Sequence, residues 1–289
     1  MPILQKASPA QLVASTLSRT LSDTVTTYTY VDFCAGAGGP TPFIEKDLNA
    51  QLSLRIPASP FTANGNGKGL TPRSPRTVNP ATDNGTVKFV LTDLHPHIPD
   101  WTEASKRSEN LSFVSDPVDA ANAPAGLNGQ DGKKIFRLYN LAFHHFEDKL
   151  GLAILKNTIE TADGFGYVKA FPHNYTECLH THLSIFELQE RTISSLITIF
   201  LMGLLMFLIT PFYFWRSPGH LFFTYIIPII PFVLVFDGYV SSLRTRSAEE
   251  VQALMKECEA SCDGWTIRSG HEQHTWPTGY LTWVIGIKE

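Results

Sequence analysis

The stretch Thr27–Thr41, TYTYVDFCAGAGGPT, decides the fold that we expect. Apolar and β-branched residues lead into a glycine cluster, and an amphipathic run follows over Pro42–Leu54. Glycine has no Cβ, so the chain can turn sharply and let a ligand approach the amides at the positive end of a helix. The stretch therefore predicts a strand, a glycine turn and a helix, with a dinucleotide, a phosphate or an adenosyl group as candidate ligand. Its candidate binding residues are Asp32, Gly36, Gly38 and Gly39.

Composition narrows the class of protein and its partners. The chain has 289 residues, 43% of them hydrophobic, which is enough for the core of a large α/β domain. A net charge of -4 gives no basic footprint, so we expect no nucleic-acid partner. The four cysteines are scattered and the first 25 residues lack an apolar segment, so we expect an intracellular, reducing location.

A second acidic residue strengthens the interpretation of the glycine turn. Asp93 ends the apolar run Val87–Thr92, and it follows Gly39 by roughly 20 positions once the proline- and glycine-rich insertion 57–86 is left out. An acid at the end of the second strand is where a ribose hydroxyl pair is bound in such folds. The sequence therefore predicts Asp93 as a ribose ligand.

Two later strand ends supply further polar candidates. Leu111–Ala120 predicts a short third strand with Asp116 and Asp119 after it, and either acid could accept from an adenine amino group or simply cap the next turn. Ile135–Leu141 predicts the fourth strand, and Asn140 at its end could offer a carbonyl or an amide to a ligand. Strand ends that face a glycine turn are where ligands bind in open α/β sheets.

The motifs VDFCAGAGGPTPF, VLTDLHP, NLAFHHF and IFELQER together resemble the class I S-adenosylmethionine-dependent methyltransferases. The chain is similar in particular to a group with FHHF after the fourth strand and with TY-x-x-P-x-x-P and DG-x-x-S-x-LR late in the chain, here Thr224–Pro231 and Asp237–Arg244. The resemblance implies a doubly wound, Rossmann-like, seven-stranded sheet with a reversed last strand. Cys34 departs from the common first motif, which has a glycine there.

The resemblance also implies S-adenosyl-L-methionine as cofactor. The residues expected to hold it are Asp32, Gly36, Gly38, Gly39, Asp93, Asp119 and Asn140. His144 and His145 are the candidate catalytic bases, because adjacent side chains on an extended chain point in opposite directions and one of them could face the pocket. A core or capping role for these histidines is the alternative.

We expect the chain to consist of four segments. The segments are an N-terminal helix (1–26), the cofactor-binding core (27–191), an inserted apolar hairpin (192–236) and a C-terminal helix with a closing β-hairpin (237–289). A stretch without apolar period, 167–184, interrupts the core before the fifth strand. It is either a surface loop or a short intron read through in frame.

The apolar hairpin predicts a membrane partner. Thr192–Trp215 carries no charged residue and no histidine, and a helix of that length spans the ~30 Å hydrocarbon core of a bilayer. Leu221–Phe236 is also uncharged, but Pro228 and Pro231 predict that it is bent, broken or re-entrant. If the flanking segments share one sheet, both ends of the hairpin lie on the same side of the membrane. A buried helical hairpin of a soluble enzyme or a dimer core is the alternative.

Residues near the C-terminus offer weaker candidates. Cys258, Cys262, His271 and His274 match no common zinc spacing, and we expect no metal site. The last two histidines, with Glu272 and Trp276, are expected in a loop between two closing strands.

Glu187 and Arg191 could form a structural ion pair, and Asp237 is expected to be structural.

Together these patterns predict a membrane-associated methyltransferase that acts on a lipophilic small molecule or lipid. A nicotinamide-dependent oxidoreductase is one rival, because it shares the glycine turn and the acidic strand end. A noncatalytic membrane-anchored protein that keeps the fold is the other. Binding of S-adenosylhomocysteine or of NAD separates the first two, and product formation separates the third.

Overall fold

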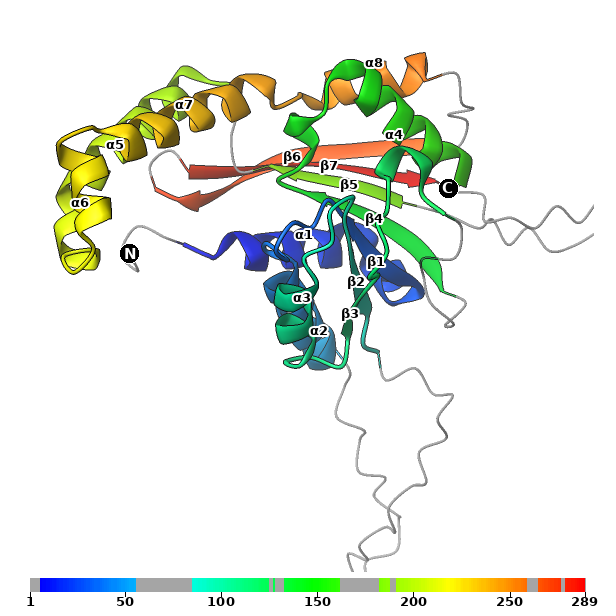
Figure 1. Ribbon diagram of the computed structural model, residues 1–289. Helices are drawn as coiled ribbons and strands as arrows, with labels where there is room; N and C mark the ends of the chain where they lie inside the picture. Colours follow the sequence, from blue (N-terminus) through cyan, green and yellow to red (C-terminus); the bar gives the residue numbers. More distant parts are fainter. Residues whose placement is uncertain are drawn as a thin grey trace, which may run out of the picture.

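A computed structural model describes most of the chain (Figure 1). The described residues are 6–55, 85–124, 127, 133–161, 182–187, 191–258, 265–276 and 279–288. Most of insertion 57–86, and 167–181 of the second insertion, lie outside them.

The described strands form one seven-stranded sheet in the order β3-β2-β1-β4-β5-β7-β6. Neighbours from β3 to β5 pair in parallel, whereas β7 is antiparallel to both β5 and β6. The α/β class expected from the sequence is confirmed. The strands are β1 (Tyr28–Phe33), β2 (Lys88–Thr92), β3 (Leu111–Phe113), β4 (Lys134–Asn140), β5 (His182–Glu187), β6 (Trp265–Thr275) and β7 (Gly279–Lys288).

Helices cover both faces of the sheet (Figure 1). On one face, α1 (Pro9–Leu21), α2 (Thr41–Arg55) and α3 (Ile98–Ser105) share a core with β1 side chains such as Tyr30. On the other face, α4 (Asp148–Thr161) and α8 (Ala248–Glu257) share a core with side chains such as Val31. Because side chains alternate along a strand, the buried run of β1 supplies both cores. The 3₁₀ turns within the described ranges are η1 (Ser22–Thr27), η2 (Ala120–Asn122) and η4 (Phe143–His145).

The apolar segment forms an arm that extends from the sheet (Figure 1). It consists of α5 (Ile193–Tyr213), α6 (Pro218–Tyr225) and α7 (Ile229–Arg244), which we call the hairpin. The axes of α6 and α7 differ by 67°, and Pro228 lies at the break, so the predicted bend is confirmed. The helix continues through Asp237 to Arg244, past the end that we predicted at Phe236.

Two other boundaries predicted from the sequence are wrong. β5 begins at His182, so residues 182–184, which we expected in the insertion, pair with β4 and β7. β6 extends to Thr275, so His271, Glu272 and His274 lie in a strand and not in a loop. β6 is at the sheet edge, where polar side chains can face water while the backbone pairs with β7.

Candidate functional site

The glycine turn after β1 has the backbone that its sequence predicts. Gly36, Gly38 and Gly39 have φ angles of 52°, 103° and 48°, in the left-handed region that favours glycine. Cys34 also lies there, with φ 63°, so the departure from the family motif is accommodated at a conformation that side chains rarely adopt. Leu141 at the end of β4 has φ 57°. The ends of two adjacent strands, β1 and β4, therefore both carry unusual backbone conformations, as functional sites often do.

Asp93 lies against the glycine turn, as its position in the sequence predicts. The Gly36 amide donates to Asp93 Oδ2 at 2.9 Å, and the His95 amide donates to Oδ1 at 2.8 Å. The Trp101 indole donates to the Gly36 carbonyl at 2.8 Å, which fixes the other side of the turn. Each carboxylate oxygen of Asp93 keeps a second lone pair with which it can accept from a ligand hydroxyl.

A buried polar cluster lies behind the turn. The Thr41 hydroxyl donates to Asp32 Oδ2 and accepts from Asn140 Nδ2 at 2.9 Å, so it joins the ends of β1 and β4. Asp32 and Asn140 were predicted from the sequence, and the structure brings them together. Thr41 was not predicted as a site residue, although its place as the first residue of α2 was a usable signal.

Two acceptor atoms in this cluster lack a partner among the described residues. These atoms are Asp32 Oδ1 and Asn140 Oδ1, and both are buried. An unsatisfied buried acceptor is destabilising by about 1–3 kcal/mol, which a ligand donor or water would relieve. The cluster thus offers unpaired oxygen atoms at the ends of two adjacent parallel strands.

Burial changes the acidity of two groups at the turn. It raises the pKa of Asp32 to about 7, while hydrogen bonds from Thr41 and Asn140 act in the opposite direction. Burial also raises the pKa of the Cys34 thiol to about 12, and the nearby carboxylates of Asp93, Asp32 and Asp119 raise it further. Cys34 therefore stays a thiol at neutral pH and is unsuited to act as a nucleophile.

Asp119 lies next to the Asp93 strand end. Its Oδ1 accepts from the Ala121 amide at 2.9 Å, so it caps η2. The Val118 amide donates to the Asp93 carbonyl at 2.9 Å and holds this loop beside the end of β2. The capping alternative for Asp119 is therefore confirmed, and a ligand role remains a prediction.

The two histidines lie in a turn, so the extended geometry that we predicted for them is wrong. His144 and His145 belong to η4, where successive side chains are not on opposite faces. Their ring centroids are 4.1 Å apart. His144 is 9% exposed and buried, whereas His145 is exposed. The turn forms because Leu141 leaves β4 in a left-handed conformation, which local sequence does not indicate.

Two arginines hold this turn, one at the last position of α7 and one just after it. Arg246 donates to the carbonyls of Phe143 and Phe146 at 3.0 and 2.7 Å and pairs with Asp148 at 2.8 Å. Arg244 donates to the His145 carbonyl at 3.1 Å. These contacts join residues about 100 positions apart in the chain, and spacing alone could not have predicted them.

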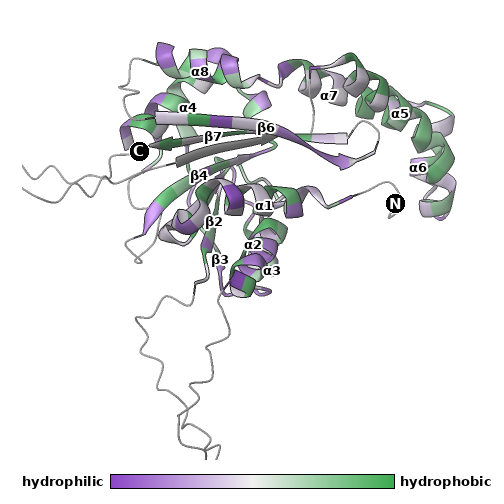
Figure 2. Cartoon of the chain, turned by 180° about the vertical axis from the view of Figure 1, so that it is seen from behind, coloured by the Kyte–Doolittle hydropathy of each residue, from purple (hydrophilic) through white to green (hydrophobic). Residues whose placement is uncertain are grey.

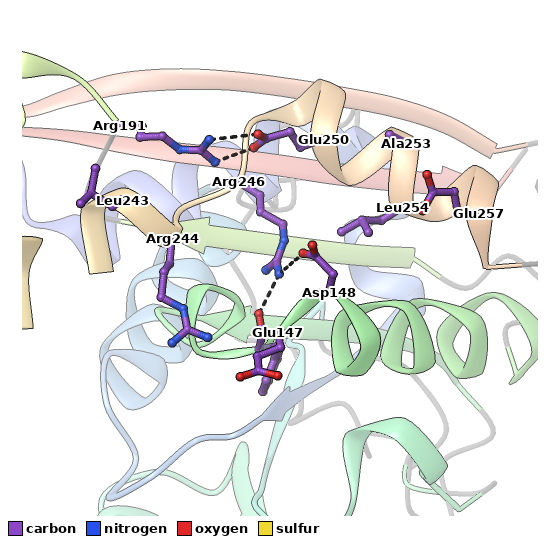
Figure 3. Close-up of a pocket in the computed structure, with 11 residues that line it drawn as sticks. Glu147, Asp148, Arg191, Leu243, Arg244, Arg246, Glu250, Ala253, Leu254 and Glu257 are labelled. Carbon is purple, nitrogen blue, oxygen red and sulfur yellow. Dashed lines mark hydrogen bonds and ion pairs between the residues drawn. The ribbon is translucent and has the colours of Figure 1, made fainter. Parts of the chain in front are cut away.

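Arg244 and Arg246 also line a cavity of about 570 Å³ where the hairpin meets the core (Figure 3). On its far side Arg191 pairs with Glu250 through two bonds of 3.0 and 2.7 Å. Arg191 therefore has a partner on α8, and the possible ion pair with Glu187 involves a side chain outside those that the structure describes. A second cavity, of about 640 Å³, lies between α2 and α3 and is lined partly by Gly38 and Gly39.

The four residues that were considered and set aside as zinc ligands are spread over the C-terminal part of the chain. Cys258 follows α8, His271 and His274 lie in β6, and Cys262 is outside the described residues. Within the described ranges, no group of three or more histidine, cysteine, aspartate or glutamate side chains is placed to hold a metal ion.

Known proteins resemble this chain in structure. No protein-family model matches the chain, and no curated protein matches it. Solved structures do match. The pyocyanin biosynthetic protein PhzM has a TM-score of 0.46 and 12% identity, over 97% of this chain and 55% of PhzM.

Two further structures are similar. The plantazolicin methyltransferase BamL, solved with a desmethylPZN analogue and SAH, has a TM-score of 0.48 and 14% identity, over 97% of this chain and 84% of BamL. The DszA carbon methyltransferase has a TM-score of 0.47 and 12% identity, over 96% of this chain and 53% of DszA. The chain thus spans about half the length of PhzM and DszA.

Proposed function

We propose that this protein is an S-adenosylmethionine-dependent methyltransferase of class I architecture. The observation that carries the proposal is the contact of Asp93 with the Gly36 amide inside a sheet of order 3-2-1-4-5-7-6 with β7 reversed. This strand order is the one that the family resemblance implies. A dinucleotide-binding dehydrogenase fold has the order 3-2-1-4-5-6 and no reversed strand inserted beside β5, so the order disfavours the oxidoreductase rival.

The residues at the strand ends fit the cofactor. Asp93 has lone pairs for the two ribose hydroxyls, and the glycine turn lets the cofactor approach its backbone closely. Asp119 is the candidate acceptor for the adenine amino group. The unpaired oxygens of Asp32 and Asn140 suit the cationic amino group of the methionine part. When bound, the cofactor supplies an activated methyl group, and the chain must align an acceptor with it.

The FHHF turn is the proposed source of a base. Removal of an acceptor proton needs a group that is neutral and basic near pH 7, and histidine has an unperturbed pKa of about 6.5. His144 is the stronger candidate, because it is buried and nearer to the end of β4. Arg244 and Arg246 would act as positioning residues, since they bind the backbone carbonyls of this turn.

The proposed acceptor is lipophilic because the turn adjoins the hairpin, whose apolar side chains are exposed. Ile193 and Phe212 are 78% and 80% exposed, and Figure 2 shows apolar residues over α5 and α7. Among the described residues, α5 is long and apolar enough to cross a membrane, and α6 with α7 passes the same test as a bent pair. A buried helical hairpin inside this chain does not match that exposure. We therefore propose a bilayer as partner.

Calorimetry with S-adenosylhomocysteine and with NAD tests the cofactor. We expect binding of the first and none of the second. Asp93→Ala should weaken S-adenosylhomocysteine binding by about 1.5–3 kcal/mol, the range for hydrogen bonds to a charged group. The matched control is Asp23→Ala, which removes an exposed acid in η1, before β1, and should leave affinity unchanged. Equal affinities in the two folded variants would contradict the assignment of Asp93.

Turnover distinguishes an enzyme from a noncatalytic relative. The full chain in detergent, incubated with labelled S-adenosylmethionine and lipid extracts, should transfer label to an extractable product. Cofactor binding without any labelled product, across extracts of different composition, would favour the noncatalytic alternative.

A further inference from the structure

The two long arms of the hairpin interlock in a fixed register. A Cβ at Gly203 of α5 would overlap the Val235 side chain of α7. A Cβ at Gly238 of α7 would lie 2.7 Å from Ile199 Cγ2 of α5. Small residues let two helices approach closely, which is the usual way in which helices pack inside membranes. These contacts place residue 203 level with 235 and residue 199 level with 238.

This register places a charge partway along the hairpin. Asp237 precedes Gly238, so it lies level with Ile199 and Phe200, and it is exposed. Beyond that level, the uncharged part of α5 is Phe200–Tyr213, which at 1.5 Å per residue is about 21 Å long. A bilayer core is ~30 Å thick, so this part is too short to cross it.

If α5 crossed the bilayer perpendicular to its plane and along its full length, the Asp237 carboxylate would lie in the hydrocarbon core. Ile193 to Phe200 corresponds to about 10 Å of helix, so Asp237 would lie that far inside the hydrocarbon. A carboxylate inside the hydrocarbon core of a bilayer is destabilising. The sequence alone does not show this, because Asp237 follows the uncharged segment in the chain and its level beside α5 appears only in the folded hairpin.

Charged residues occur at three levels along the hairpin. Arg191 and Arg244 lie at its base, Asp237 lies level with Phe200, and Arg216 lies at the tip. Arg216 lies over the Trp215 ring at 4.5 Å, a pair typical of a membrane–water interface. All three levels can stay among lipid headgroups only if the long axis of the hairpin is parallel to the membrane surface.

We propose that the hairpin lies in the interface of one leaflet and does not cross the bilayer. Its exposed apolar side chains then lie among the acyl chains of that leaflet, while the three charged levels reach its headgroups. This inference rests on the membrane partner named in the proposed function. The side chains that would enter are drawn from Leu204, Leu208 and Phe212 of α5 and Phe232 and Phe236 of α7.

A bilayer fits this surface better than a second copy of the chain does. The exposed apolar residues of α5 include the consecutive positions Phe200, Leu201 and Met202, which point in directions about 100° apart around the helix. A single protein partner covers one face of a helix, whereas lipid can surround most of it. A chain whose apolar surface is covered by a second copy would stay dimeric in water and would not float with vesicles.

The test is one-sided labelling of the tip. Ser217→Cys is made in the full chain with its four native cysteines replaced by serine, and the protein is added from outside to preformed vesicles of phosphatidylcholine and phosphatidylglycerol. Flotation first separates the bound chain. A membrane-impermeant maleimide is then added before or after the vesicles are permeabilised. Ser53→Cys, an exposed position at the end of α2, is the matched control, and Gly219→Cys is a second tip position with open space around it.

We expect Ser217→Cys and Gly219→Cys to label in sealed vesicles to the same extent as Ser53→Cys, with no gain on permeabilisation. Labelling of the tip only after permeabilisation would mean that the tip is across or deep within the bilayer and would overturn the proposal. A chain that stays dimeric in water and does not float would overturn the membrane partner itself. Calorimetry with S-adenosylhomocysteine would still test the methyltransferase proposal independently of that result.

Discussion

The glycine-turn region and the hairpin depart from the usual distribution of polar and apolar groups in opposite ways. The turn region buries a carboxyl group, with Asp32 only 1% exposed. The hairpin exposes side chains that are normally buried, such as Phe212 at 80%. Each region is unfavourable in water by itself. The turn region is stabilised mainly from within the chain, by Thr41 and Asn140, whereas the described residues leave the apolar side chains of the hairpin exposed.

The difference indicates what each region binds. Unpaired oxygens in a rigid polar cluster suit a small ligand with a few donors. An extended apolar surface around two helices suits a lipid phase, which has no fixed donors or acceptors. The two regions meet at η4, where arginines from the end of the hairpin bind the FHHF backbone.

The largest effect is expected where the two regions meet. His144→Ala should lower turnover by roughly 10² to 10⁴, the usual range for removing a positioned base, while the affinity for S-adenosylhomocysteine stays nearly unchanged. The measurement is initial rate at saturating acceptor in detergent, with calorimetry on the same samples. His145→Ala is the matched control and should keep most of the activity. Full turnover in both variants would remove the histidines from the mechanism.

The next largest effect is the pH dependence of the free energy of unfolding that the buried Asp32 carboxyl group causes. In the unfolded chain Asp32 ionises near the ordinary aspartate pKa of 3.8, whereas burial raises the folded pKa to about 7. Between these values the folded state binds more protons, so the free energy of unfolding should fall as pH rises from about 4 to 7 and then level off. The shift corresponds to on the order of 4 kcal/mol.

Denaturant unfolding of the wild type and of Asp32→Asn, in one detergent from pH 4.5 to 8, measures this effect. The variant cannot ionise at this position, so the stability of the wild type relative to the variant should decline across the window. Asp93 is close enough to raise the pKa further and is present in both proteins. A difference that does not change with pH would mean that Asp32 is ionised in the folded protein.

The smallest effect tests the packing of α5 on α7 at the inner face of the hairpin. Gly203→Leu should destabilise the packing of α5 on α7 by about 1–3 kcal/mol, because the added side chain overlaps Val235. Gly219→Leu is the control, since open space surrounds that position, and it should change stability by less than about 0.5 kcal/mol. Helix unfolding followed by circular dichroism in detergent gives both values. Equal midpoints would indicate that the two arms do not pack in the register described.

Local patterns were sufficient to predict the sheet side of the site. The Asp93 contact with Gly36 follows from a glycine turn after one strand and an acid after the next, because parallel neighbours end at the same edge. The break at Pro228 is an equally local signal, and it was predicted correctly.

Contacts between distant segments explain what the sequence did not show. Nothing near His145 indicates that Arg244, far along the chain, binds its carbonyl. The polar run around His271 suggested a loop because a sheet edge tolerates polar side chains, and only its pairing with β7 identifies the strand. Likewise, the level of Asp237 beside Phe200 depends on how two helices interlock.

The strand order has a consequence for biosynthesis. β7 lies between β5 and β6, yet the ribosome makes it after both of them, and after the whole hairpin and α8. The sheet therefore cannot be completed until the hairpin has emerged, and for that interval an unfinished core and an apolar arm are exposed together. Early capture of the hairpin by a membrane would protect the nascent chain from aggregation, and the final strand would then enter a sheet that is already held at the lipid surface.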